Sequence, residues 1–222
     1  MANPNAPHGL QPVGYTNGAP WTGKANLYHV QSTDTLAYYI GDIMRIVPAG
    51  GANSSTVGSD ALGVPNVTGN AAGAIAVFNG QLGPIVGIQV APIGVGTPGG
   101  SQNQAVNLNI LYIPATKLQD YYVWIADDYN LEFEIQSDAT VLANATTVGM
   151  NAGYTVAAPA TVNGPLSGTV LTGASLAVTQ TLPLKVVRYA YRPNILVFGA
   201  FSPLIVRWNS HQYSSPTGTL GT

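Results

Sequence analysis

Hydrophobic and polar residues alternate most regularly in residues 128–136. Every second residue there is apolar, and acidic or amide side chains occupy most of the positions between. The apolar positions are Tyr129, Leu131, Phe133 and Ile135. Because successive side chains of a β-strand point to opposite faces, this period of two residues predicts a strand with one face in the core. The opposite face carries Asp128, Glu132 and Glu134 and is therefore acidic.

Runs of β-branched and aromatic residues recur along most of the chain, separated by clusters of Gly, Pro, Asn and Ser. This spacing is typical of sandwiches and barrels. The predicted strands are residues 27–31, 37–47, 74–78, 84–93, 106–113, 121–126, 129–136, 182–191, 195–198 and 204–209. Only residues 139–150 could form a short helix, and their Thr and Val content disfavours one. We therefore predict an all-β fold, a β-sandwich of jelly-roll type, with a small twisted β-barrel as the alternative.

Two segments differ from this strand pattern. Residues 1–25 are rich in Pro, Gly and Asn and show no periodicity, which predicts an extended N-terminal arm. Such an arm either lies along a neighbouring subunit or frays as a free terminus. Residues 151–180 carry no charge and are rich in Gly, Ala and Thr, which indicates a loop or a β-excursion. Since no repeat or boundary is visible, residues 26–222 are expected to form a single β-sandwich domain that includes this excursion.

Charged residues are scarce in this chain. They make up 7% of 222 residues, against about 25% in an ordinary soluble domain. The apolar fraction is 46%, so the chain lacks the low hydrophobicity and high net charge of disordered proteins. A monomer kept in solution by charge would carry more Lys and Glu, and much of this surface is therefore expected to face protein. The alternative is a neutral surface of Ser, Thr, Asn and Gln.

The net charge of −2 at pH 7 limits the possible partners. Without an excess of positive charge, neither nucleic acid nor an anionic membrane is an expected partner. The N-terminus shows no signal-peptide pattern, and no apolar run approaches the ~20 residues of a spanning helix. The chain also contains no Cys. We expect a soluble product of a reducing cytosol.

The few charges are segregated along the chain. Six of the nine acidic residues lie between positions 120 and 138 with no base among them. The C-terminal strands carry the bases Lys185, Arg188, Arg192 and Arg207 with no acid among them. We expect the two segments to pair, either as neighbouring strands of one subunit or as complementary patches of two subunits.

Two glycine-containing segments match phosphate-binding spacings only in part. Residues 18–25 have the spacing of a phosphate loop up to Lys24, but Ala25 stands where a Ser or Thr would hold magnesium. Residues 94–99 have the glycine pattern of a dinucleotide loop, yet Pro98 and the polar residues after it cannot begin a packed helix. Both segments are predicted to be turns, and no cofactor is expected.

Ionisable side chains indicate no catalytic or metal site. The acidic face of residues 128–136 could hold calcium or a glycosidase pair, but a solvated or interface face explains it better. The three His residues are widely spread: His8, His29 and His211. Nucleophilic catalysis would need a Cys or a Gly-x-Ser-x-Gly motif, and the sequence has neither. We predict no catalytic residue, no metal and no enzymatic activity.

Three groups of segments, taken together, carry a resemblance to a known family. The first is residues 2–13 (ANPNAPHGLQPV) and 17–21 (NGAPW). The second is residues 39–43 (YIGDI), 122–128 (YVWIADD) and 131–136 (LEFEIQ). The third is residues 206–213 (VRWNSHQY). Together they resemble the small cement or decoration proteins of tailed-bacteriophage heads, with one departure at Gly14, where such proteins more often carry a basic stretch.

This resemblance implies a non-enzymatic protein on the outer surface of an icosahedral head. It would be made in the host cytoplasm and would bind the major capsid protein and itself, as a dimer or a trimer. A small decoration-protein barrel is the corresponding alternative fold. The composition agrees with this function, because a cement protein bridges capsomers through many weak symmetric contacts and needs no titratable centre.

A tail or fibre module that binds host glycans is the alternative function. Four aromatic residues would then be stacking platforms, although aromatics at strand spacing are more often core. They are Tyr121, Tyr122, Trp124 and Trp208. For the cement function, the residues expected to contact partners lie in the arm and among the clustered charges. They are Pro7, Leu10, Pro12, Val13, Trp21, Asp127, Asp128, Arg192 and Arg207.

Overall fold

The computed structural model describes residues 3–47, 60, 63–90, 110–142, 145–159, 166–193 and 198–214. In these residues the chain consists of strands and turns with two 3-10 turns, η1 (Ala145–Thr147) and η2 (Gly173–Ser175). The strands are β1 (Gln11–Tyr15), β2 (Asn26–Val30), β3 (Tyr38–Tyr39), β4 (Ile43–Ile46), β5 (Val67–Gly69), β6 (Gly73–Ile75), β7 (Gln81–Val90), β8 (Tyr112–Ile113), β9 (Tyr121–Ile125), β10 (Leu131–Gln136), β11 (Asn151–Ala152), β12 (Tyr154–Val156), β13 (Val170–Leu171), β14 (Leu184–Tyr189) and β15 (Pro203–Trp208).

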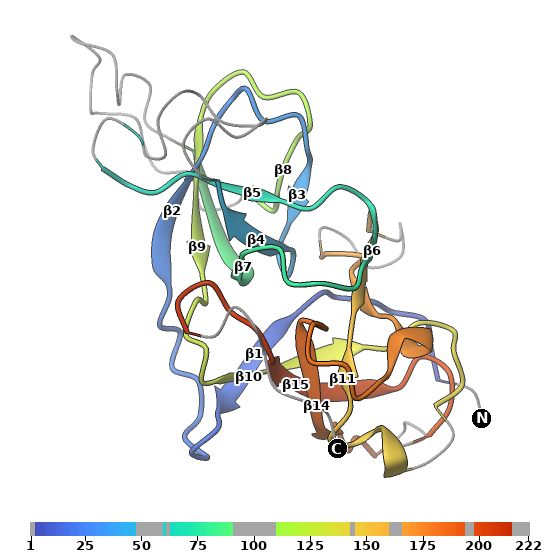
Figure 1. The fold of residues 1–222 in the computed structure, drawn as a ribbon. Coiled ribbons are helices and arrows are strands. Elements are labelled where there is room, and N and C mark those ends of the chain that lie inside the picture. The colour runs from blue at the N-terminus through green and yellow to red at the C-terminus, as the bar shows by residue number, and fades with distance from the viewer. Residues whose placement is uncertain are drawn as a thin grey trace, which may run out of the picture.

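The strands gather into two lobes, each with its own hydrophobic cluster (Figure 1). In the upper lobe of Figure 1, antiparallel strands follow the order β2-β9-β7-β4-β5. A parallel bridge between His29 and Asn66 joins β2 to the residue before β5, so the two outer strands of this sheet meet. The curled sheet encloses a core to which the β3-β8 ribbon adds Tyr38 and Ile113.

The lower lobe contains a five-stranded antiparallel sheet, β1-β10-β15-β14-β11, and a three-stranded sheet, β13-β12-β6. Both sheets contribute to one buried cluster. Phe133 and Val206 enter it from the larger sheet, while Tyr154 and Leu171 enter it from the smaller one, and all four are fully buried. Two sheets that share one core have the arrangement of a sandwich.

These observations confirm the all-β class. The alternation in residues 128–136 is confirmed over β10, where Leu131, Phe133 and Ile135 are fully buried. The antiparallel sheets are consistent with a sandwich, and the jelly-roll connectivity stays a prediction. Of the possible helix at residues 139–150, the described residues contain only the short η1. Most of the predicted strand 195–198 and the glycine segment 94–99 lie outside the described residues.

The predicted strand 37–47 is two strands, β3 and β4, separated by a tight turn. Gly41 has a φ of +93° in this turn, and Gly9 has a φ of +69° directly beside it. A Cβ atom at Gly9 would lie 2.3 Å from the carbonyl oxygen of Gly41. The close approach of two backbones therefore requires glycine here, and it attaches the N-terminal segment to the upper lobe.

The N-terminal segment belongs to the fold, which corrects the expectation of an arm without regular structure. Residues 11–15 form β1, which pairs with β10 along the edge of the large sheet. Before β1, the Ala6 amide donates to Gln136 Oε1, and Asn3 Nδ2 donates to the Ala200 carbonyl. The pairing register shifts between Pro12 and Gly14, so this strand is irregular. Residues 151–180 are likewise structured in part, since they contain β11, β12, β13 and η2.

No described residue belongs to a helix that is long and apolar enough to cross a membrane.

Candidate functional site

Strand pairing in the large sheet brings the acidic and basic segments together within one chain. β15 lies between β10 and β14, so the C-terminal bases face the acids of β10. Arg188 bonds Glu132 and Arg192 bonds Glu134, each with a nitrogen–oxygen distance of 2.5 Å. These two pairs resolve the alternative left open by the sequence, since the segments pair as elements of one subunit.

Glu134 is held by two bases. His8 Nε2 lies 3.6 Å from Glu134 Oε1, and Arg192 bonds the same oxygen. The neighbouring His8 and then the Arg192 guanidinium lower the pKa of Glu134, against the opposing effect of burial. The carboxylate therefore stays ionised. Because His8 belongs to the N-terminal segment, its contact with Glu134 helps to hold this segment against the sheet.

Arg207 differs from Arg188 and Arg192. It is exposed and has no acidic partner within ion-pair distance among the described residues. Its cross-strand neighbours are Glu132 and Lys185. The Glu132 carboxylate is already paired with Arg188, and Lys185 carries the same charge as Arg207. Burial and the nearby Arg207 lower the pKa of Lys185. Within the described part of the chain, the Arg207 guanidinium near the end of β15 is therefore not neutralised by an acid.

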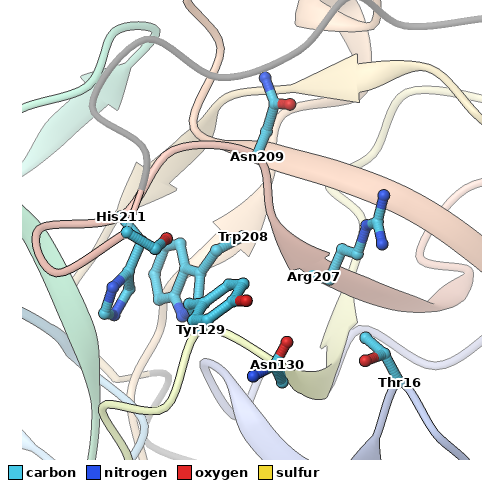
Figure 2. Close-up of a pocket in the computed structure, with 8 residues that line it drawn as sticks. Thr16, Tyr129, Asn130, Arg207, Trp208, Asn209 and His211 are labelled. Carbon is cyan, nitrogen blue, oxygen red and sulfur yellow. The ribbon is translucent and has the colours of Figure 1, made fainter.

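A hollow of about 300 Å³ opens beside this guanidinium (Figure 2). It lies where β15 ends and where the segment between β9 and β10 turns. Its walls combine hydroxyl, amide, aromatic and basic side chains: Thr16, Tyr129, Asn130, Arg207, Trp208, Asn209, His211 and Ser214. Trp208 is buried, and its indole Nε1 has no hydrogen-bond partner in the described part of the chain.

His211 is held as a neutral imidazole at this hollow. Its Nε2 donates to the Leu82 carbonyl at 2.5 Å, so its Nδ1 accepts from the Tyr213 amide. Burial lowers the pKa of His211, which agrees with the neutral form. Both ring nitrogens are occupied by the backbone, and this residue therefore connects the C-terminal segment to β7 of the other lobe.

A second hollow, of about 480 Å³, contains the two predicted contact residues Asp127 and Asp128. Asn26 Nδ2 donates to both oxygens of Asp127 at 2.9 and 3.0 Å, and the Tyr28 hydroxyl donates to it at 2.5 Å. Burial, and then the contacts of the Tyr28 hydroxyl with Asp127 and Tyr213, raise the pKa of Tyr28. Asp128 accepts from the Asn130 amide and so shapes the turn before β10.

The remaining predicted contact residues are spread over the fold. Pro7 and Leu10 are buried inside the chain itself and present no surface to a partner. Pro12 and Trp21 are half-buried, and Val13 on β1 is 39% exposed. The structure therefore does not gather these residues into one site, and Val13 and Arg207 lie on the walls of different hollows.

The sequence reasoning missed a buried ion pair in the upper lobe. The side chains of Lys117 and Asp34 are 0% and 1% exposed, with 3.6 Å between Nζ and Oδ1. Lys117 also donates to the carbonyls of Asp34 and Leu36 at 2.6 Å. The Tyr38 and Thr68 hydroxyls donate to Asp34 at 2.6 and 2.7 Å. No sequence pattern marked this pair, because an isolated Lys in a turn is normally solvated.

Other sequence candidates take structural roles. Residues 14–20 form a tight turn, in which the Tyr15 amide donates to the Ala19 carbonyl and Gly14 forms a β-bridge with Pro20. The segment that partly matches a phosphate loop therefore begins within a turn. Across the described ranges, no three His, Cys, Asp or Glu side chains come close enough to bind a metal ion.

No known family, curated protein or solved structure matches this chain. Any functional assignment therefore rests on the residues and their geometry.

Proposed function

We propose that this chain is a structural cement or decoration protein of a tailed-bacteriophage head. It is made in the host cytoplasm, binds the major capsid protein on the outer surface of the head, and bridges capsomers together with copies of itself. The sequence segments described above supply the resemblance. The observation that best supports a docking function is the exposure of Leu118.

Leu118 is 97% exposed, while its neighbour Lys117 is buried. A turn normally places the Lys in water and the Leu inside. Here Lys117 is bonded to Asp34 and Leu36, so the turn is fixed and Leu118 is presented rigidly to the outside. A preorganised apolar side chain loses little entropy on binding, which favours contact with another protein.

The charge arrangement supports the same function. Arg188, Arg192, Glu132 and Glu134 neutralise one another within the chain. Large apolar side chains are exposed at several separate places, among them Tyr191, Val141, Val77, Val178 and Leu111. A surface of this kind binds by shape and apolar contact, and weak contacts repeated on a symmetric lattice add up through avidity.

The tail or fibre alternative receives less support. Of its four predicted stacking platforms, Tyr121, Tyr122 and Trp208 are buried, and Trp124 alone is exposed, at 40%. Buried rings contribute to the core and cannot stack on a ligand from solvent.

Binding to phage heads tests the proposal. Purified protein is added to mature heads that lack it, from the phage that encodes this chain, and co-sedimentation and the melting temperature of the heads are measured. We expect saturable binding and a higher melting temperature. Leu118→Asp should weaken binding at least tenfold, whereas Thr181→Asp, which introduces the same charge at an exposed polar position, should retain it. If the wild-type protein does not bind mature heads, the proposal is wrong.

A further inference from the structure

We propose that the free edge of β6 pairs with the β6 edge of a second copy of this chain, antiparallel and about a two-fold axis. This inference rests on the proposed function, in which copies contact one another, and it selects a dimer over a trimer. The contact would join two three-stranded sheets into one six-stranded sheet that runs across both subunits. Such a strand pair is isologous, so one surface serves both copies.

β6 is an edge strand. In the sheet β13-β12-β6 it pairs with β12 on one side, and no described strand pairs with its other side (Figure 1). Within the described part of the chain, the backbone of residues 71–76 makes no hydrogen bond outside this ladder. Successive residues of a strand direct their N–H and C=O groups to alternate sides, so part of this backbone has no partner. An edge of this kind is a template for another strand.

Small exposed side chains leave the space beside β6 open. No atom lies within 4 Å of the position that a Cβ atom would take at Gly73. The side chains of Ala72, Ala74 and Ala76 are exposed and too short to keep a second backbone away. Ile75 packs against the core of the lower lobe and holds the strand in place. A second strand can therefore approach to the spacing of about 4.8 Å that neighbouring strands adopt.

The absence of charge favours a second copy as the partner. Two identical strands bring the same side chains together, so a charge near the axis would repel its own copy. The sequence contains no Asp, Glu, Lys or Arg between Asp60 and Lys117. The Arg45 guanidinium donates to Asn79, beyond the end of β6. Proteins often block an edge with Lys or Pro, and neither occurs in residues 70–79.

The two-fold axis restricts the register. Hydrogen-bonded and non-hydrogen-bonded positions alternate along an antiparallel pair, so identical strands related by a two-fold axis place one residue opposite its own copy. With Ala74 on the axis, Gly73 of each copy lies opposite Ile75 of the other, and the largest side chain of β6 meets the smallest. The contact is small beside the ~800 Å² that each partner buries in a standard interface. We expect a Kd on the order of 0.1 mM in solution, with higher occupancy where a lattice holds copies side by side.

Disulfide trapping tests this dimer, because the chain has no Cys. Ala74→Cys places two thiols opposite each other, with about 4.5–5.5 Å between Cβ atoms, so a small adjustment allows a disulfide. Ala19→Cys is the matched control, since Ala19 is also an exposed Ala and lies on a turn. Under mild oxidation, Ala74→Cys should form a disulfide-linked dimer at least tenfold faster than Ala19→Cys does.

Sedimentation of the wild-type protein gives a second, independent measurement. It should show an equilibrium between monomer and dimer. Ala74→Lys should abolish the dimer, because two like charges would face each other across the axis. Ala19→Lys adds the same charge away from β6 and should dimerise as the wild type does.

Four results would overturn the proposal. Equal oxidation rates of the two Cys variants would do so, and so would an Ala74→Lys variant that dimerises unchanged. A wild-type protein that forms trimers, or that stays a monomer well above the expected Kd, would also contradict it. If such a monomer bound heads more weakly as Ala74→Lys, the edge would belong to a strand of the capsid protein instead. Trapping and sedimentation need no heads, so failure of this pairing and failure of head binding are distinguished.

Discussion

Replacing Lys117 with Met tests the buried pair that fixes the Leu118 turn. Met has a similar length but no charge, so Lys117→Met leaves the Asp34 carboxylate buried without a cation. The carbonyls of Asp34 and Leu36 also lose their donor, because both accept from Lys117 Nζ at 2.6 Å. Burial lowers the pKa of Lys117, although the nearby Asp34 opposes this effect, so the ammonium depends on its partner to stay charged.

The magnitude follows from the environment of Asp34. Removing one partner of a buried ion pair costs about 3–5 kcal/mol. Asp34 keeps hydrogen bonds from Tyr38, Thr68 and the Leu36 amide, so the lower end of this range applies. In a chain of this size, about 3 kcal/mol lowers the melting temperature by roughly 6–12 °C.

Urea unfolding and thermal unfolding measure this loss. Lys24→Met is the matched control, since Lys24 is exposed, and it should change the free energy of unfolding by less than about 0.5 kcal/mol. The double variant Asp34→Asn/Lys117→Met should be more stable than the sum of the single changes by about 1–3 kcal/mol. If Lys117→Met costs no more than the control, the pair does not hold the turn and the reasoning is refuted.

Three further predictions concern stability. Burial lowers the pKa of His29, but hydrogen bonds to Asp120 and Asn66, at 3.2 and 2.7 Å, outweigh it and raise the pKa above its usual value. Stability from this group is present below about pH 6.5 and lost as pH rises through the raised pKa; urea midpoints at several pH values should show this loss in the wild type and not in His29→Gln. Burial raises the pKa of Asp42 to about 6, so its contribution is present below about pH 4 and lost as pH rises to about 6; the same titration should show no loss in that window for Asp42→Asn. Gly9→Ala should lower the melting temperature more than Gly18→Ala, because both have positive φ but only Gly9 has a carbonyl 2.3 Å from the added Cβ atom.

The alternation of apolar and polar residues predicted those strands whose sequences alternate regularly. β10 alternates strictly, and its apolar face is buried as expected, whereas Glu134 and Gln136 on the opposite face are also buried, within the chain itself. The segregated charges predicted that the two segments pair, because strands that carry opposite charges stabilise one another as neighbours. Sequence alone could not show that the pairing lies within one chain.

Long-range contacts account for what the sequence did not show. β1 contains Pro12 and Gly14 at an irregular register, so its pattern resembles a loop until β10 pairs with it. The curling of the upper sheet depends on the bridge between His29 and Asn66, which are 37 positions apart. The hollow at Arg207 likewise combines residues from β15, the turn before β10 and Thr16. No short motif contains such a set.

The copy number of the chain in purified virions tests the central claim most directly. The proposed function makes the chain a virion component, so quantitative gel analysis of virions of the proposed phage compares its amount with that of the major capsid protein. A cement protein should be present in a copy number of the same order as the major capsid protein. A few copies per particle would indicate a tail or fibre component, and absence from the virion would contradict a role on the head.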